Sequence, residues 1–68
     1  MNSASFQQSV DHGPFSVDLH ACRNAERPTF ATFVYQRSSE RLLRQHFTGS
    51  DENDVICQAL KWCEENSR

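Results

Sequence analysis

The stretch TFATFVYQ, residues 29–36, constrains the fold more than any other part of the sequence, because it has the pattern of a strand with apolar side chains on both faces. The two faces carry Phe30, Thr32 and Val34, and Ala31, Phe33 and Tyr35. A strand in a small sheet usually alternates between apolar and polar residues, since one face meets the core and the other meets water. The rest of the chain is able to cover only one of these faces. We expect the other face to be an interaction surface, and the sequence leaves open which face that is.

The length of 68 residues allows one domain. A chain of this size buries only about 60% of the surface that it exposes when unfolded, so it usually needs disulfides, a metal ion or a partner subunit for stability. Three cysteines cannot all pair within one chain, and the first residues have neither the charge nor the apolar run of a secretory signal. We therefore expect reduced thiols, a cytoplasmic location, no membrane segment and support from a partner subunit.

The clearest strand pattern lies just before this stretch. Residues 15–21, FSVDLHA, alternate between apolar and polar, and a polar connector, residues 23–28, leads to a second strand over residues 29–37. Residues 1–14 are mostly polar and end in Gly-Pro, which is typical of a turn. We expect residues 1–14 to be a flexible N-terminal tail and residues 15–66 to form the single domain.

The segment RLLRQHFTG, residues 41–49, fits two interpretations. As a helix, it pairs Leu42 with His46 and Leu43 with Phe47 at a spacing of four residues. As a strand, it directs Leu43 and Phe47 toward the core. The segment is short for a helix, and a third strand of a meander pairs naturally with the second. The sequence therefore favours a strand.

The C-terminal part of the sequence predicts an amphipathic helix. Ser50 or Asp51 is placed to cap its free amides, and the acidic residues that follow suit the positive end of the helix dipole. The apolar stripe consists of Ile56, Ala59, Leu60 and Cys63, broadened by Val55 and Trp62. Glu64 and Glu65 oppose the dipole in the last turn, so we expect the helix to fray after Cys63.

These elements predict an α+β fold: a three-stranded antiparallel β-meander with one C-terminal α-helix packed on one face, in the order β-β-β-α. The expected core consists of Phe15, Val17, Leu19, Leu43 and Phe47 beneath Ile56, Leu60 and Trp62. One helix covers one face of such a sheet, and the second face stays open.

The sequence gives little support to catalysis or metal binding. His20, Cys22 and His46 are candidate zinc ligands, but their spacing matches no paired-ligand motif. Cys22 with either histidine is the only candidate nucleophile and base, and so small a fold has little volume for a catalytic pocket. The two glycines in the chain are too few for a phosphate-binding loop. We expect no metal, no cofactor and no enzymatic activity.

The remaining hypothesis is a small protein-binding or regulatory module that acts through the open sheet face, on a second copy of itself or on a different protein. The predicted contact residues are Phe30, Val34, Tyr35, Arg37, Arg44 and His46. Aromatic residues and arginine are enriched at such interfaces, and the chain has six arginines and one lysine. The alternative is a nucleic-acid-binding module that uses the cluster of Arg37, Arg41 and Arg44, although a net charge of −2 disfavours it.

Overall fold

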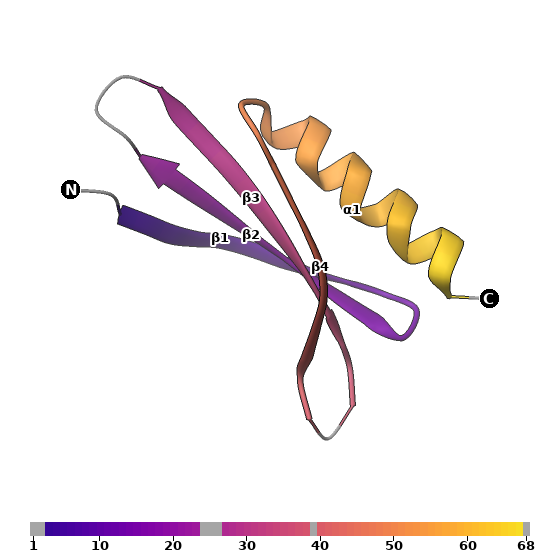
Figure 1. Ribbon diagram of the computed structural model, residues 1–68. Helices are drawn as coiled ribbons and strands as arrows, with labels where there is room; N and C mark the ends of the chain where they lie inside the picture. The colour runs from indigo at the N-terminus through magenta and orange to yellow at the C-terminus, as the bar shows by residue number, and fades with distance from the viewer. Residues whose placement is uncertain (1–2, 24–26, 39, 68) are drawn as a thin grey trace.

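The computed structural model describes residues 3–23, 27–38 and 40–67 as one antiparallel sheet with a helix packed on one face (Figure 1). The elements are β1 (Ser3–His12), β2 (Phe15–Arg23), β3 (Pro28–Gln36), β4 (Leu42–Gly49) and α1 (Glu52–Asn66). The strands lie in the order β1-β2-β3-β4 within a single four-stranded sheet. The expectation of an α+β fold with a C-terminal helix on the sheet is confirmed, and the expectation of a three-stranded meander is wrong.

The additional strand is β1, which occupies most of the segment expected to be a tail. His12 pairs with Phe15, so a two-residue turn, Gly13-Pro14, connects β1 to β2. Gly13 has a φ of 59°, a conformation that glycine adopts without strain and that hairpin turns of two residues require. The Gly-Pro pair therefore closes a hairpin. Of the expected connector at residues 23–28, residues 24–26 lie outside the described residues.

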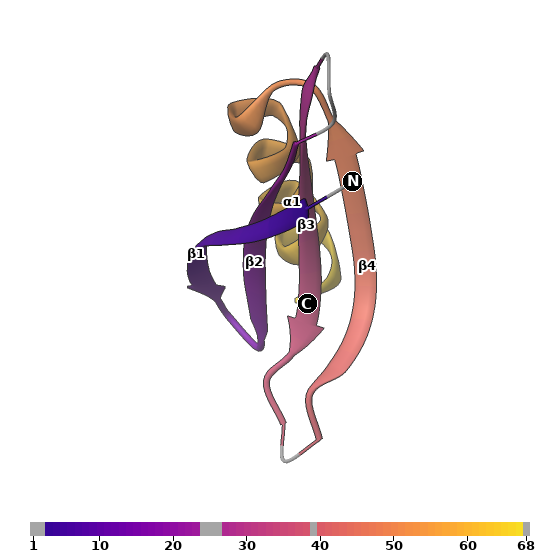
Figure 2. The same cartoon turned by 90° about the vertical axis from the view of Figure 1, so that its left-hand side faces the viewer.

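β1 is irregular in the middle. Its register with β2 shifts between Phe6 and Gln8, which is the mark of a β-bulge. Its first half swings away from the plane of the sheet, toward the side opposite α1, and it passes in front of β2 and β3 in Figure 2. The bulge thus bends one edge of the sheet over the face that the helix leaves free.

The register of β3 decides which of its faces is buried by the helix. Thr32 pairs with Leu19 and Val34 pairs with Val17, so these residues share the face that carries the core. Thr32 also donates a hydrogen bond from Oγ1 to the carbonyl oxygen of Val55 at 3.1 Å, which ties the sheet to the first turn of α1. The side chains of Ala31, Phe33 and Tyr35 lie on the other face of β3, opposite the helix.

The segment that fitted both a helix and a strand is strand β4. Its pairing with β3 shifts between Val34 and Tyr35, so that Gln45 lies opposite Val34 while Leu43 lies opposite Tyr35. This shift moves Leu43 to the face opposite the helix, where its side chain is 52% exposed. The expected place of Leu43 in the core is therefore wrong, whereas Phe47 does pack against the core from the helix side.

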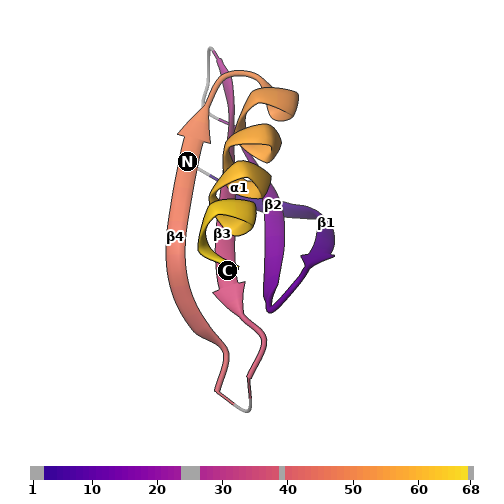
Figure 3. The ribbon, with the colours of Figure 1, turned by 90° about the vertical axis from the view of Figure 1, so that its right-hand side faces the viewer.

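The core lies between α1 and strands β2, β3 and β4 (Figure 3). Val55, Ala59 and Cys63 are the fully buried residues of the helix. The core cluster consists of Phe15, Val17, Val34, Ala59 and Cys63, with Phe47, Leu60 and Trp62 packed against it. Trp62 meets Phe15 edge-on, with ring centroids 5.2 Å apart. The helix therefore seals one face of the sheet.

The two ends of α1 are capped by polar side chains. Asp51 is the N-cap residue, and its side chain accepts a hydrogen bond from the Asn53 amide at 3.3 Å. It is one of the two cap residues that the sequence predicts. At the other end, Asn66 Nδ2 donates to the Trp62 carbonyl at 2.8 Å and Ser67 Oγ donates to the Glu64 carbonyl at 3.2 Å. These bonds satisfy two of the last carbonyls, so the helix continues to Asn66. The expectation of fraying after Cys63 is wrong.

Candidate functional site

The sheet face opposite α1, called the open face below, carries a diagonal row of four rings. The row, called the aromatic line, consists of Phe6, His20, Phe33 and His46, one ring from each strand. The ring centroids are 5.6 Å, 5.3 Å and 6.2 Å apart along the line. The first two contacts are edge-to-face, and the last is stacked. Such spacings are typical of favourable ring pairs.

The registers of the three strand pairs explain why these rings meet. Phe6 lies directly opposite His20, and Phe33 lies directly opposite His46. His20 and Phe33 are diagonal neighbours across β2 and β3, which is still within reach of aromatic side chains. Exposure rises toward both ends of the line, because Phe6 and His46 are exposed while His20 and Phe33 are half-buried. The line therefore offers ring surface to a partner.

A polar cluster lies beside the aromatic line on the same face. The Asp18 carboxylate accepts a hydrogen bond from Ser9 Oγ at 2.8 Å and one from Arg41 Nη2 at 2.6 Å. Its side chain is only 9% exposed. The Arg41 guanidinium also stacks on the Tyr35 ring, 4.1 Å from its centroid. A buried carboxylate is costly unless it is paired, and Arg41 and Ser9 are the partners that Asp18 has at this position.

The six predicted contact residues do not form one surface. Tyr35 and His46 lie on the open face, which is where the predicted contact with a partner places them. Phe30 and Val34 lie on the helix face, and Val34 has no exposed surface at all. The structure therefore brings together only part of the predicted set and leaves Val34 no contact with a partner.

The three arginines of the alternative hypothesis point to different parts of the molecule. Arg37 lies at the β1–β2 turn, where it pairs with Asp11 at 3.2 Å and donates to the Gly13 carbonyl. Arg41 lies on the open face beside Asp18. Arg44 lies on the helix side, where it donates to Gln36 Oε1 at 2.6 Å and its guanidinium carbon is 5.9 Å from the Trp62 ring centroid. Each guanidinium already has a partner within the chain, which leaves less charge for a phosphate backbone.

The residues predicted from the sequence as contacts do not include Phe6, Phe33 and Asp18, which all lie on the open face. A regular hairpin that starts with His12 opposite Phe15 would place Phe6 opposite Ala21, on the helix face. The bulge moves it by one residue and so turns it to the open face. The alternation of apolar and polar residues in β2 does indicate that Asp18 faces away from the core. The burial of the Asp18 side chain, however, depends on Arg41, which is 23 positions away in the sequence.

The candidate zinc ligands are not gathered around one point. His20 and His46 flank the Phe33 ring on the open face. Within residues 3–23, 27–38 and 40–67, no group of three or more His, Cys, Asp or Glu side chains is arranged to hold a metal ion. The three cysteines are free thiols with different exposure, and burial raises the pKa of the Cys63 thiol. The thiol with the most shielded sulfur is therefore the least suited to act as a nucleophile.

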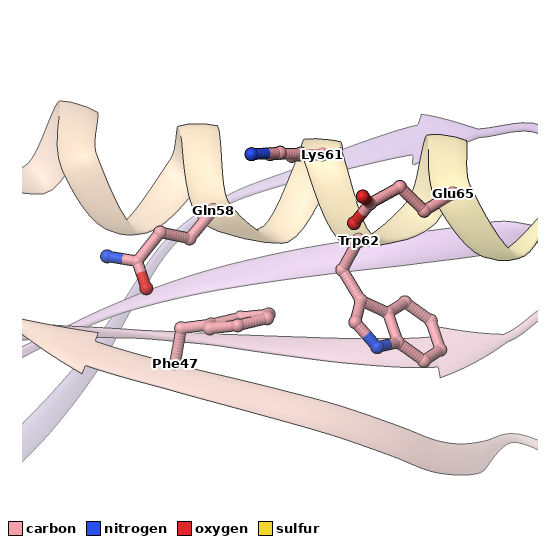
Figure 4. A pocket seen from close by; sticks show the side chains of 5 residues that line it. All are labelled: Phe47, Gln58, Lys61, Trp62 and Glu65. Atoms are coloured by element: carbon pink, nitrogen blue, oxygen red, sulfur yellow. The ribbon is translucent and has the colours of Figure 1, made fainter.

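A hollow, called the side groove, lies between α1 and β4 (Figure 4). Its volume is about 230 Å³, and it is lined by Phe47, Gln58, Lys61, Trp62 and Glu65. The Phe47 and Trp62 rings form its floor, and the polar ends of the other three side chains surround them. The groove is shallow and opens beside the outer strand of the sheet.

Comparisons with models of protein families, with curated proteins and with solved structures each find no match. Among the described residues, no helix is both long and apolar enough to cross a membrane. The functional argument therefore rests on the surfaces described above, of which the open face carries the largest set of convergent aromatic side chains.

Proposed function

We propose that this protein is a small non-enzymatic binding module whose partner is another protein, and that the open face is its contact surface. The observation that carries the proposal is the aromatic line, which crosses all four strands on the one sheet face that α1 leaves free. Phe6, at its outer end, is 57% exposed. Exposed rings of this kind are the side chains that contribute most to protein interfaces.

The surroundings of the aromatic line support a protein partner. Protein interfaces combine an apolar centre with a polar rim, and here Arg41 bonds to Asp18 beside the rings, while the exposed Asp11 lies further along β1 on the same face. The acidic residues on the same face, Asp11 and Asp18, pair with Arg37 and Arg41 and so reduce the positive charge that binding to a phosphate backbone requires. Because Asp18 and Arg41 neutralise each other, the surface beside the rings carries little net charge.

Phe6→Ser tests this proposal directly. Phe6 is largely exposed and contributes little to the core, so the variant should fold with nearly wild-type stability. Loss of a central or anchoring ring from an interface typically costs 1 kcal/mol or more, so we expect at least a roughly fivefold weaker affinity for the partner. The measurement is capture of partner proteins on immobilised wild-type and variant chains, followed by titration of the captured protein.

Val10→Ser is the matched control. Val10 lies on the same strand, is also exposed and pairs with Val17 on the helix face. A partner that is retained by wild type and Val10→Ser but lost by Phe6→Ser supports the open face. Equal retention by both variants would show that binding uses a different surface.

A further inference from the structure

The outer edge of β4 is free for pairing. β4 is the last strand in the sheet order and pairs only with β3. The backbone amide of His46 donates to the side chain of the neighbouring Gln45, at 3.0 Å, and so points away from β3. Leu43 lies opposite Tyr35, and its amide points the same way. Arg37 donates to the Pro14 carbonyl on the β2 side, and the hydrogen-bonding direction alternates along an antiparallel strand, so Tyr35 also bonds toward β2 and leaves Leu43 unpaired. A free edge of this kind is a template for another strand.

This edge also exposes apolar side chains. Leu42 and Leu43 are 54% and 52% exposed, and no residue of β4 is fully buried. The other edge of the sheet differs, because the bulge between Phe6 and Gln8 bends β1 out of the plane. Bulges at an edge are a common means of preventing further strand pairing. Of the two edges, β4 is therefore the one suited to association.

Two opposite charges on α1, beside β4, would be complementary to the same two charges of a second copy. Lys61 and Glu65 lie one helical turn apart at the rim of the side groove. A twofold axis that passes midway between them would bring Lys61 of one copy to Glu65 of the other, and the same contact would occur twice. An interface between identical surfaces needs this kind of self-complementarity.

The position of that axis agrees with the exposed leucines. The Arg44 guanidinium lies over the Trp62 ring, which places Trp62 at the level of Arg44. α1 runs back along the sheet in the direction opposite to β4 (Figures 1 and 3). The midpoint of Lys61 and Glu65 is one residue beyond Trp62, about 1.5 Å further along the helix, which corresponds to the level between Leu43 and Arg44. The same axis therefore also brings Leu43 against its own copy.

We infer that the protein forms a twofold dimer in which β4 pairs antiparallel with β4 of a second copy. The product is a continuous eight-stranded sheet with both helices on one side, with the leucines and the two side grooves at the junction. The open faces then lie on the other side of the sheet, so the dimer presents two aromatic lines to partners. This inference concerns a surface other than the proposed binding face and stands independently of it.

Leu43→Pro tests the pairing, because Leu43 lies next to the axis. Proline lacks the outward amide and is tolerated on an edge strand, where that amide does not contribute to the existing ladder. We expect wild type to have the dimer mass at the higher of two concentrations tenfold apart in light scattering, and Leu43→Pro to have the monomer mass at both. Leu43→Val keeps the amide and an apolar side chain, and it should have the mass of wild type. Circular dichroism confirms that each variant is folded.

A charge exchange gives an independent test in case the proline variant does not fold. Lys61→Glu or Glu65→Lys alone would place like charges against each other twice and should weaken dimerisation several-fold, since an exposed pair contributes about 0.2–1 kcal/mol. The double variant Lys61→Glu/Glu65→Lys should restore the affinity and keeps the spacing of both charges within the helix.

Three results would overturn the inference. They are a wild-type monomer at both concentrations, a folded Leu43→Pro that remains a dimer, and single charge variants that dimerise like wild type. Phe6→Ser separates this inference from the proposed function, because it should leave the dimer mass unchanged while it weakens partner binding.

Discussion

At the scale of single residues, burial distinguishes side chains that look alike in the sequence. Cys22 is half-buried, Cys57 is exposed and Cys63 is fully buried in the core cluster. A buried thiol packs as a small apolar group, and its environment disfavours the thiolate. Burial therefore raises the pKa of Cys63 above the ordinary value of 9.0.

The raised pKa of Cys63 predicts a loss of stability at alkaline pH. Below pH 9.0 the thiol is neutral in both the folded and the unfolded chain. As pH rises above that value, the unfolded chain releases the proton first, so the free energy of unfolding decreases with pH. We expect urea unfolding to show this decrease between pH 8 and pH 10.5, and Cys63→Ala to show a smaller decrease over the same range. An identical pH dependence in the two proteins would contradict the assignment.

Leu43 and Phe47 illustrate the limit of pattern analysis at this scale. Their spacing predicts two inward residues, and the structure buries only Phe47 from the helix side. One extra residue in β4, at the register shift opposite Val34 and Tyr35, turns Leu43 to the other face. Bulges depend on how two strands fit together, so the sequence of one strand does not reveal them.

At the scale of elements, strong periodicity was predictive and weak periodicity was not. The alternation in β2 and the apolar stripe of α1 identify these elements, and Asp51 is among the expected N-cap residues. β1 has the sequence SASFQQSVDH, which contains few of the residues that favour strands. Its strand conformation depends on pairing with β2 and on the polar contacts of the open face.

The Ser9 contact gives a test of whether β1 is part of the folded domain. Ser9→Ala removes the hydroxyl that donates to the largely buried Asp18 carboxylate. A hydrogen bond to a charged group contributes about 1.5–3 kcal/mol, and we expect a loss of stability near the lower end, because Arg41 remains. The measurement is the free energy of urea unfolding.

Gln7→Ala is the control for this change. Gln7 is an exposed residue of the same strand, and its side chain bonds only within β1, to Ser5. We expect its stability to stay within about 0.5 kcal/mol of wild type. If Ser9→Ala were equally neutral, β1 would behave as the flexible tail that its composition suggests.

At the scale of the whole molecule, the distribution of charge matters more than its sum. The net charge is only −2, yet Arg37, Arg41 and Arg44 are close in sequence and suggest a basic cluster. In the folded chain Arg37 and Arg41 are bound to Asp11 and Asp18 on the open face, and Arg44 is bound to Gln36 on the helix side. Proximity in sequence therefore does not produce a continuous basic surface here.

This distribution predicts weak binding to nucleic acid. Binding to a phosphate backbone depends on the number of free cations that displace counterions. We expect a fluorescent single-stranded oligonucleotide to show no saturable binding to the protein in a titration up to about 10 μM at low salt. Saturable binding that weakens steeply with added salt, and that Arg41→Ala reduces, would favour the nucleic-acid hypothesis over the proposed protein partner.

The sequence by itself determined the elements whose pattern is strong: the strands at residues 15–21 and 29–37, the capped C-terminal helix, and the helix packed on an antiparallel sheet. These follow from local alternation and helical periodicity, which depend on residues close together in the chain. Only the tertiary structure decided that Phe30, Thr32 and Val34 face the helix, that β1 completes the sheet, and that four rings from four strands form a line. These features depend on strand register and on two bulges, which are set by contacts between distant segments.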